Sequence, residues 1–378
     1  FLGRKGLERE MEGVSDLYRG KVVMVTGAGG SIGSELCRQV LACRPRRLVL
    51  YELSELALYQ VERELSDLAQ GQKKRRPVEI VPVLGSVTDA GTVGRTLAGE
   101  EVEIVLHAAA YKHVPMVERN PLSGLYNNVI GTRTLAEAAG QHGVSHFVLI
   151  STDKAVRPTN IMGASKRMAE LVIQDLATRS NGPHSTGSNG TRYAMVRFGN
   201  VLGSSGSVIP LFEEQIGRGG PVTVTHREVT RYFMTIGEAA RLVLTAGTFT
   251  EGGDVFVLDM GQPIPIMKLA RDMIEAAGYT VRDEANPDGD IEIEVTGLRP
   301  GEKLHEELLI GSRLLGTHHP KILRALETHL SQIEIATALK SLQTAIAESD
   351  PETAREVVRR WVDGYTPDIM ETSEVSGA

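Results

Sequence analysis

The stretch KVVMVTGAGGSIG, residues 21–33, decides how this chain folds. It opens with an apolar run of the kind found in buried parallel strands, and residues 34–42 continue as a helix. Between a strand and a helix, a glycine-rich turn can offer backbone N–H groups to a pyrophosphate. Gly27 permits the tight turn, Gly30 lets the backbone approach the phosphates, and Gly33 lets the helix pack on the strand. The predicted dinucleotide contacts are Gly27, Gly30, Ser31, Ile32 and Gly33.

An acidic residue ends the second predicted strand, residues 47–51. Glu52 follows the glycines at about the 20-residue spacing at which a carboxylate meets the adenosine ribose. Such a carboxylate accepts hydrogen bonds from the ribose hydroxyls and repels a 2′-phosphate. The sequence therefore favours NAD over NADP, although Arg46 and Arg47 are nearby and the direction of their side chains stays open.

Two further predicted strands, residues 78–84 and 104–107, end at the same edge of the sheet. The residues there that are predicted to contact the cofactor are Ser86, Val87, His107, Ala108 and Ala109. Asp89 has two interpretations, an adenine contact or a helix cap. Asn128, in a helix predicted over residues 121–141, either braces neighbouring strand ends or reaches the cofactor.

A second motif, STDKAVRPTNIMGASK at residues 151–166, begins where the apolar run 146–150 ends. Ligands of open α/β sheets bind outside the carboxyl ends of the strands. The hydroxyl of Thr152, the carboxylate of Asp153 and the amine of Lys154 are therefore predicted to face a cleft, where the last two form an acid–base pair. The alternative is a solvated loop with a helix cap.

After the sixth predicted strand, residues 193–197, the regular alternation of strands and helices gives way to shorter elements. The loop FGNVLGSSGSV, residues 198–208, suits a second phosphate-bearing ligand or a plain turn. Two segments rich in basic residues, 227–232 and 298–305, suit a diphosphate, with surface salt bridges as the alternative. The predicted substrate contacts are Lys112, His113, Asn200, Ser207, Val208, Arg231, Arg299 and Glu302.

These patterns predict an α/β protein: a doubly wound, parallel Rossmann sheet with a smaller mixed α/β C-terminal domain for the substrate. The expected divisions are an N-terminal arm (1–19), a dinucleotide domain (20–200), a substrate domain (201–330) from which some chain returns to the sheet, and C-terminal helices with a tail (331–378). The net charge of −7 argues against binding nucleic acid through its phosphates. Cys37 and Cys43 fit no metal motif, and no metal site is predicted.

Together, TGAGGSIG (26–33), HAAAYKH (107–113) and STDK (151–154) resemble the extended short-chain dehydrogenase/reductases. RFGNVLGSSGSV (197–208) and RPGEK (299–303) are similar to one branch of them, the UDP-N-acetylglucosamine 4,6-dehydratases of bacterial polysaccharide and glycan biosynthesis. The resemblance covers roughly residues 20–330. It implies an NAD-binding Rossmann domain and a smaller domain that holds a nucleotide sugar, here UDP-N-acetylglucosamine.

One position departs from the superfamily, whose Tyr-x-x-x-Lys motif is Met162-x-x-x-Lys166 here. Methionine cannot donate or accept a proton in place of the tyrosine. The resemblance implies a catalytic set of Thr152, Asp153, Lys154, Met162 and Lys166. Lys154 is expected to remove the sugar C5 proton, for which burial or nearby cations must lower its pKa. Asp153 is expected to protonate the C6 hydroxyl, Thr152 to orient the C4 hydroxyl, and Lys166 to hold the nicotinamide ribose.

The larger, membrane-anchored dehydratases of this branch resemble the chain in carrying methionine at that position. By this resemblance we expect a catalytic part on the cytoplasmic face of a longer bacterial inner-membrane protein. A homodimer is expected through helices 121–141 and 163–177, which pair across dimers in the superfamily. A nucleotide-sugar 4-epimerase and a non-catalytic NAD-binding scaffold remain as alternatives. The sequence leaves open the C2 substituent of the sugar and the configuration at C5.

Overall fold

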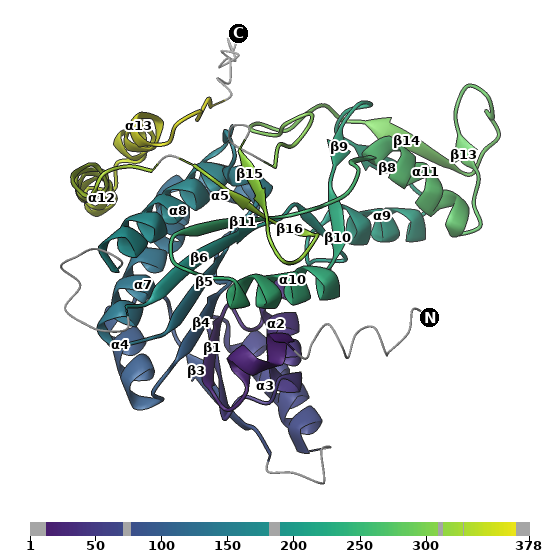
Figure 1. The fold of residues 1–378 in the computed structure, drawn as a ribbon. Helices are drawn as coiled ribbons and strands as arrows, with labels where there is room; N and C mark the ends of the chain where they lie inside the picture. The colour runs from purple at the N-terminus through teal and green to yellow at the C-terminus, as the bar shows by residue number, and fades with distance from the viewer. Residues whose placement is uncertain (1–12, 71–76, 181–189, 309–312, 328, 368–378) are drawn as a thin grey trace.

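The computed structural model describes residues 13–70, 77–180, 190–308, 313–327 and 329–367. Their centre is a nine-stranded sheet with the order β15-β16-β11-β6-β5-β4-β1-β2-β3 (Figure 1). The strands of its N-terminal part are β1 (Val22–Thr26), β2 (Arg47–Glu52), β3 (Glu79–Leu84), β4 (Ile104–His107), β5 (His146–Ile150) and β6 (Arg192–Arg197). They are all parallel, and β1 lies between β2 and β4. This order confirms the predicted doubly wound sheet, whose ligand crevice lies where the strand order reverses, next to β1 and β4.

Helices cover both faces of the sheet (Figure 1). One face carries α2 (Ser31–Ala42), α3 (Glu55–Gln70) and α10 (Ile236–Thr248), and the other carries α4 (Ala90–Gly99), α7 (Gly131–Gln141) and α8 (Ile161–Ser180). Each face has its own apolar core because the central strands are buried on both sides. Residues 13–18, inside the predicted arm, form a helix that belongs to the first face. Its Tyr18 is fully buried and donates a hydrogen bond to the carbonyl of Leu244 in α10.

The chain after β6 contributes to two places. A smaller lobe has its own core and is built on α9 (Val208–Gly217), β8 (Val222–Val224), α11 (Ile266–Ala276), β13 (Val281–Arg282) and β14 (Ile291–Val295). Short pairings join β7 (Asn200–Leu202) to β10 (Phe233–Thr235), and β9 (Thr230–Arg231) to β12 (Ile264–Pro265). The main sheet is extended by β11 (Asp254–Leu258), parallel to β6, and by the antiparallel strands β16 (Ile322–Ala325) and β15 (Leu314–Gly316). The functional cavity lies where the lobe meets the sheet.

The helix α8 is covered within its own chain. Its residues from Ile161 to Ala177 are buried, and the C-terminal helices α12 (Gln332–Ala347) and α13 (Pro351–Trp361) pack against it (Figure 1). The helix pair that we expected to be free for dimerisation is therefore not free on this side. The homodimer expected through these helices stays a prediction.

The helix predicted over residues 121–141 is not regular. It consists of α6 (Pro121–Leu125), the π-helical turn η1 (Tyr126–Ile130) and α7, and it follows the short helix α5 (Val114–Arg119). Asn128 lies in the π-helical turn, where its amide bonds the N–H and carbonyl of Tyr111 and the hydroxyl of Ser165. Of the two interpretations of Asn128, the bracing role is therefore the one observed, because its side chain ties the segment after β4 to α8. Asp89 is a helix cap, since its carboxylate accepts the backbone N–H groups of Gly91 and Thr92 at the start of α4.

In the described part of the chain, no helix is both long and apolar enough to cross a bilayer.

Candidate active site

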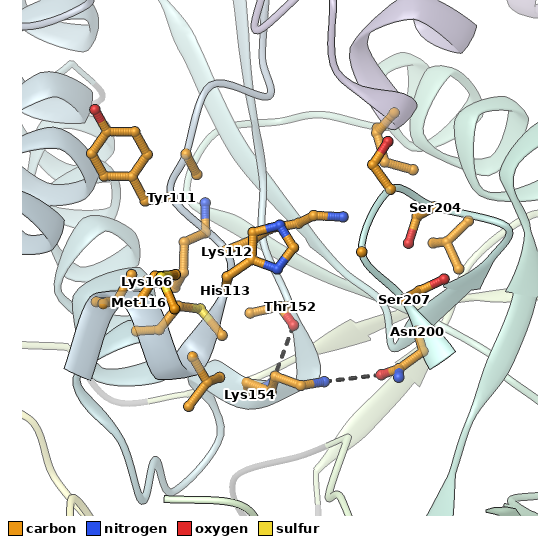
Figure 2. A pocket seen from close by; sticks show the side chains of 18 of the residues that line it. Tyr111, Lys112, His113, Met116, Thr152, Lys154, Lys166, Asn200, Ser204 and Ser207 are labelled. Carbon is orange, nitrogen blue, oxygen red and sulfur yellow. Dashed lines mark hydrogen bonds between the residues drawn. The ribbon is translucent and has the colours of Figure 1, made fainter. Parts of the chain in front are cut away.

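A cavity of about 840 Å³ opens between the glycine turn, the loop after β5 and the loop that joins β7 to α9. This volume is in the upper part of the range for ligand sites. Figure 2 shows Lys166, Thr152 and Lys154 on one side of this space and Asn200, Ser204 and Ser207 on the other, with Lys112 and His113 between them. The cavity therefore brings together the two motifs that the sequence singled out.

The glycine turn lines one end of the cavity. Gly27, Gly30, Ser31, Ile32, Gly33 and Ala108 all face it. A Cβ on Gly27 (φ +64°) would come 2.8 Å from the backbone nitrogen of Ala109, and one on Gly33 would overlap the carbonyl of Gly27. Helix α2 begins here with no side-chain cap at Gly30. Its first N–H groups are therefore available to an anionic ligand.

Of the other predicted cofactor residues, Lys166 lines this cavity, whereas Glu52, Ser86, Val87, His107 and Ala109 do not. Glu52 accepts a hydrogen bond from Gly29 N–H at 2.9 Å, so its carboxylate holds the glycine turn at the end of β2. Ser86 bonds the Thr88 hydroxyl at 2.7 Å, and Val87 is buried. Ala109 meets the turn through its backbone, whose N–H donates to Thr26 at 3.3 Å. Glu52 and Ala109 therefore contact the glycine turn.

The side chain of His107 lies in the core. Its ring nitrogens bond the hydroxyls of Thr26 at 2.7 Å and Thr132 at 2.8 Å. Burial, with a smaller contribution from Lys166, lowers the pKa of His107 to about 3, so the imidazole is neutral at ordinary pH. The side chain of His107 thus joins β1 and β4 to α7, and the cofactor contact expected at this residue stays a prediction.

The loop after β5 forms a connected polar group at the opposite end of the cavity. The one-turn 3₁₀ helix η2 (Asp153–Ala155) begins at Thr152, whose hydroxyl donates to Asp153 Oδ1 at 2.9 Å. Lys154 Nζ donates to the same oxygen at 3.0 Å and to Asn200 Oδ1 at 3.0 Å. Asp153 is fully buried. Its Oδ2 has no hydrogen-bond partner among the described residues.

The expected role of Lys154 as a base required a lowered pKa, and the structure does not meet this condition. Burial alone would lower its pKa, as expected, but Asp153 and Glu306 outweigh burial and the pKa lies above the usual lysine value. The amine is therefore protonated without a ligand. Any role for Lys154 as a base requires that it first pass its proton to a neighbour, and Asp153 Oδ1 is in hydrogen-bond contact.

The second lysine of the site, Lys166, has its pKa shifted in the opposite direction. Lys166 lies on the first turns of α8 and donates to the carbonyl of Ile150 at 2.7 Å. Burial lowers its pKa to about 8, against a smaller opposing effect of Glu170. Met162, one helical turn earlier, is 3% exposed and lines the cavity, so no protonatable group stands at that position.

The far wall of the cavity belongs to the loop before α9. Ser207 precedes that helix, and its hydroxyl is buried without a partner among the described residues. Ser205 N–H donates to Ser31 Oγ at 3.2 Å, so this loop touches the glycine turn directly. Lys112 and His113 line the space between, and burial lowers the pKa of each. For His113 the charge of Lys112 adds to this effect.

Arg231 and Glu302 form a salt bridge with each other. Arg231 Nη2 lies 3.0 Å from Glu302 Oε1, and its Nη1 donates to the carbonyls of Thr230 and Leu304. The salt bridge that the sequence left as an alternative is therefore present, although both residues also line the cavity. Asn200, Val208 and Arg299 line it as well.

Two residues of the site, Gly163 and Glu306, were not predicted from the sequence. Gly163 is needed because a Cβ there would overlap the carbonyl of Lys154, which fixes how closely α8 approaches η2. Glu306 lines the cavity, and its Oε1 lies 3.6 Å from Lys154 Nζ. The sequence shows Glu306 and Glu307 as an equivalent pair, and only the fold separates the buried one from the exposed one.

A buried ionic network supports the loop after β5 from beneath. Ser151 Oγ donates to Glu170 at 2.6 Å, and Arg197 on β6 contacts the same carboxylate at 2.5 Å. Arg197 and Arg167 also contact Glu327, which follows β16. With these partners the pKa of Glu170 falls to about 2 although burial alone would raise it. The network joins strand β6, helix α8 and the C-terminal segment under the loop after β5.

Sheet order, glycine turn and the loop after β5 define an extended short-chain dehydrogenase/reductase, and comparisons with known proteins agree. Residues 23–327 match the model of a family described as "Polysaccharide biosynthesis protein". The chain belongs to this family.

Its relatives include "Capsular polysaccharide biosynthesis protein CapD" of Staphylococcus aureus, 46% identical over 347 residues that make up 90% of this chain and 54% of that protein. The chain thus spans about half the length of this relative. Among solved structures, "Pen from Bacillus thuringiensis" is similar with a TM-score of 0.67 and 33% identity, over 78% of this chain and 84% of that one.

Relatives with named activities fall into two groups. A "UDP-N-acetylglucosamine 4,6-dehydratase (inverting)" of Campylobacter jejuni is 30% identical over 78% of each chain. A "UDP-glucose 4-epimerase" of Rickettsia rickettsii is 32% identical over 78% of this chain and 79% of that protein. The chain is therefore related to nucleotide-sugar dehydratases and epimerases.

Proposed function

We propose that the chain catalyses the NAD-dependent 4,6-dehydration of UDP-N-acetylglucosamine to a UDP-4-keto-6-deoxy sugar for surface polysaccharide or glycan synthesis. The observation that carries the proposal is the contact of the fully buried Asp153 with Thr152 and Lys154, both of which line the cavity. Transfer of a hydride between the sugar and the cofactor needs only one group that accepts the proton of the sugar hydroxyl. An elimination also needs an acid and a base on neighbouring carbons, and this contact offers both.

The glycine turn fits a dinucleotide. The backbone comes so close at Gly27 and Gly33 that no side chain fits, and the start of α2 offers uncapped N–H groups at the cavity. Bound there, NAD would supply a hydride acceptor for the sugar C4 and a hydride donor for C6. Glu52, held against Gly29, keeps a carboxylate at the end of β2, which supports NAD over NADP.

The remaining chemistry belongs to side chains of this chain. Thr152 orients the C4 hydroxyl and links it to Asp153 Oδ1, which its own hydroxyl contacts at 2.9 Å. Lys154 passes its extra proton to Asp153 across the 3.0 Å contact, which leaves a neutral amine and a protonated carboxyl. The amine then takes the C5 proton, and the carboxyl gives its proton to the departing C6 hydroxyl, so that water leaves. The proton of the C4 hydroxyl would leave to solvent as the hydride departs from C4. When the hydride returns to C6, the Lys154 ammonium would give its proton back to C5, and a proton from solvent would restore the pair. The products are then one 4-keto-6-deoxy sugar and one water for each substrate.

The loop before α9 is the proposed diphosphate site. The hydroxyl of Ser207, which has no hydrogen-bond partner in the described part of the chain, and the start of α9 face the cavity, and Lys112 and Arg299 line it. Together they offer hydrogen-bond donors and positive charge, which suit a diphosphate. The acetamido sugar follows from the named activity of the Campylobacter jejuni relative. Attachment to the cytoplasmic face of a membrane, through a segment outside this chain, remains part of the proposal.

The test is incubation with NAD and UDP-N-acetylglucosamine in deuterated water, read by mass spectrometry and proton NMR. We expect loss of one water, a C6 methyl signal whose coupling collapses through deuterium at C5, and no accumulation of NADH. The C5 configuration of the product distinguishes inversion from retention.

A 4-epimerase is the second candidate, because the Rickettsia rickettsii relative carries that name. Epimerisation would leave the sugar mass unchanged and alter only the C4 configuration. NAD binding with no change in any UDP-sugar offered would instead support the non-catalytic scaffold and reject both enzyme proposals.

A further inference from the structure

The segment that follows the lobe reaches back across the sheet to the catalytic loop. Gly301 accepts hydrogen bonds from Thr159 Oγ1 at 2.8 Å and Asn160 Nδ2 at 2.9 Å, while Lys303 Nζ donates to the carbonyl of Val156 at 2.7 Å. These contacts fix residues 299–306 against the loop between η2 and α8. Glu306 is thereby held at the cavity by several bonds that its own side chain does not make.

The carboxylate of Glu306 is buried and incompletely bonded. The side chain is 4% exposed, its Oε1 lies 3.6 Å from Lys154 Nζ, and its Oε2 has no hydrogen-bond partner among the described residues. A buried carboxylate without full hydrogen bonding is costly, so a structural role alone gives little reason for it. Its nearest opposite charge is the amine proposed to act on the sugar.

Lys154 is consequently enclosed by charges from several elements. Asp153 on its own loop and Glu306 on the 299–306 segment are negative, Arg231 on β9 is positive, and Asn200 on β7 is a neutral acceptor. Arg231 is itself neutralised by Glu302 at 3.0 Å. Two carboxylates therefore act on one amine, while one carboxylate would suffice for a simple ion pair.

We infer that Glu306 is a positioning residue that keeps the shared proton on the Asp153–Lys154 pair until the nucleotide sugar is bound. The dehydration needs one proton on this pair, because a pair that has lost it has no acid for the C6 hydroxyl. The negative charge of Glu306 disfavours loss of that proton to solvent, so the pair stays competent into the alkaline range. This inference rests on the proposed dehydration for its kinetic part only.

The variants are Glu306→Gln, which removes the charge at nearly constant shape, and Glu306→Asp, which keeps it. Glu307→Gln is the matched control, because Glu307 is the neighbouring residue, is 44% exposed and pairs with Arg157. Two measurements are made on the 378-residue chain across a pH series. One is the rate at which an amine-reactive reagent labels Lys154, read by peptide mass spectrometry, and the other is kcat/KM for the dehydration.

In Glu306→Gln we expect the pKa of Lys154 to fall and the alkaline limb of kcat/KM to move to lower pH. Activity above neutral pH should drop by roughly tenfold or more, within the range that acid–base groups contribute. Glu306→Asp should restore much of both readouts, and Glu307→Gln should match the wild type.

An unchanged labelling profile of Lys154 in Glu306→Gln would overturn the inference, even if activity fell. If the wild type does not dehydrate any nucleotide sugar, the proposed function fails, whereas the labelling experiment still decides whether Glu306 controls Lys154.

Discussion

Lys154 and Lys166 face the same cavity, yet their surroundings shift their pKa values in opposite directions. Burial lowers the pKa of Lys166 to about 8, because its bonded partner is the neutral carbonyl of Ile150. Lys154 is also desolvated, but Asp153 and Glu306 reverse the effect. The comparison teaches that burial alone does not decide the charge of an active-site amine, because carboxylates supplied by other elements can outweigh it.

Changing the Lys154 region should have the largest effect on activity. Asp153→Asn and Lys154→Ala each remove half of the proposed acid–base pair, so kcat for dehydration should fall by about 10²- to 10⁴-fold. NAD binding, followed by fluorescence or calorimetry, should stay near the wild-type value because neither side chain lies in the glycine turn. Near-native turnover by either variant would remove these assignments.

The ionic network beneath both lysines should dominate stability. Glu170→Gln removes one of the two carboxylates that lie 2.5 Å from the buried Arg197, and the loss of one partner of a buried ion pair typically costs about 3–5 kcal/mol. Denaturant unfolding near pH 7 measures this loss. Asp272→Asn, which breaks the exposed pair with Lys268, should change the unfolding free energy by no more than about 1 kcal/mol. The wild type should also weaken below pH 4.5, because the contribution of Glu170 is lost as pH falls toward its pKa of about 2.

The Lys166 region predicts a second pH dependence, of the same sign as that of Glu170 but in the alkaline range. Its folded-state pKa of about 8 lies below the ordinary lysine value of 10.5, so the unfolded chain binds more protons between these two values. Stability from this group should therefore rise with pH from about 8 to 10.5, by about 3 kcal/mol in total. The free energy of unfolding of the wild type minus that of Lys166→Met, measured at pH 7.5 and 10.5, isolates the effect. A pH-independent difference would show that Lys166 is not desolvated.

Substitution of Met162, one helical turn before Lys166, should have the smallest effect on activity and stability. Met162→Leu nearly conserves the volume of this 3% exposed side chain, so it should cost less than about 1.5 kcal/mol. Because a thioether supplies no proton, kcat should stay within a few-fold of the wild type. A loss as large as that of Lys154→Ala would mean that the sulfur takes a direct part.

The sequence predicted those regions whose structure depends on residues that are close to one another along the chain. Strand β1, the glycine turn and α2 are contiguous, and their hydrophobic pattern and glycines are readable in the chain. The Thr152–Lys154 motif was readable for the same reason. The sequence did not show what packs against His107 and helix α8, namely Thr132 and the C-terminal helices, because these partners lie far away in the chain.

By itself, the sequence determined the doubly wound sheet, the position of the glycine turn and the chemical groups of the loop after β5, because local pattern and backbone sterics specify them. Only the tertiary structure decided the charge of Lys154. That charge depends on the adjacent Asp153 and also on Glu306, which lies 152 positions further along the chain and is held near the amine by the contacts of Gly301 and Lys303. Electrostatic effects fall with distance in space and not with separation in sequence, so folding had to bring these groups together before their protonation was defined.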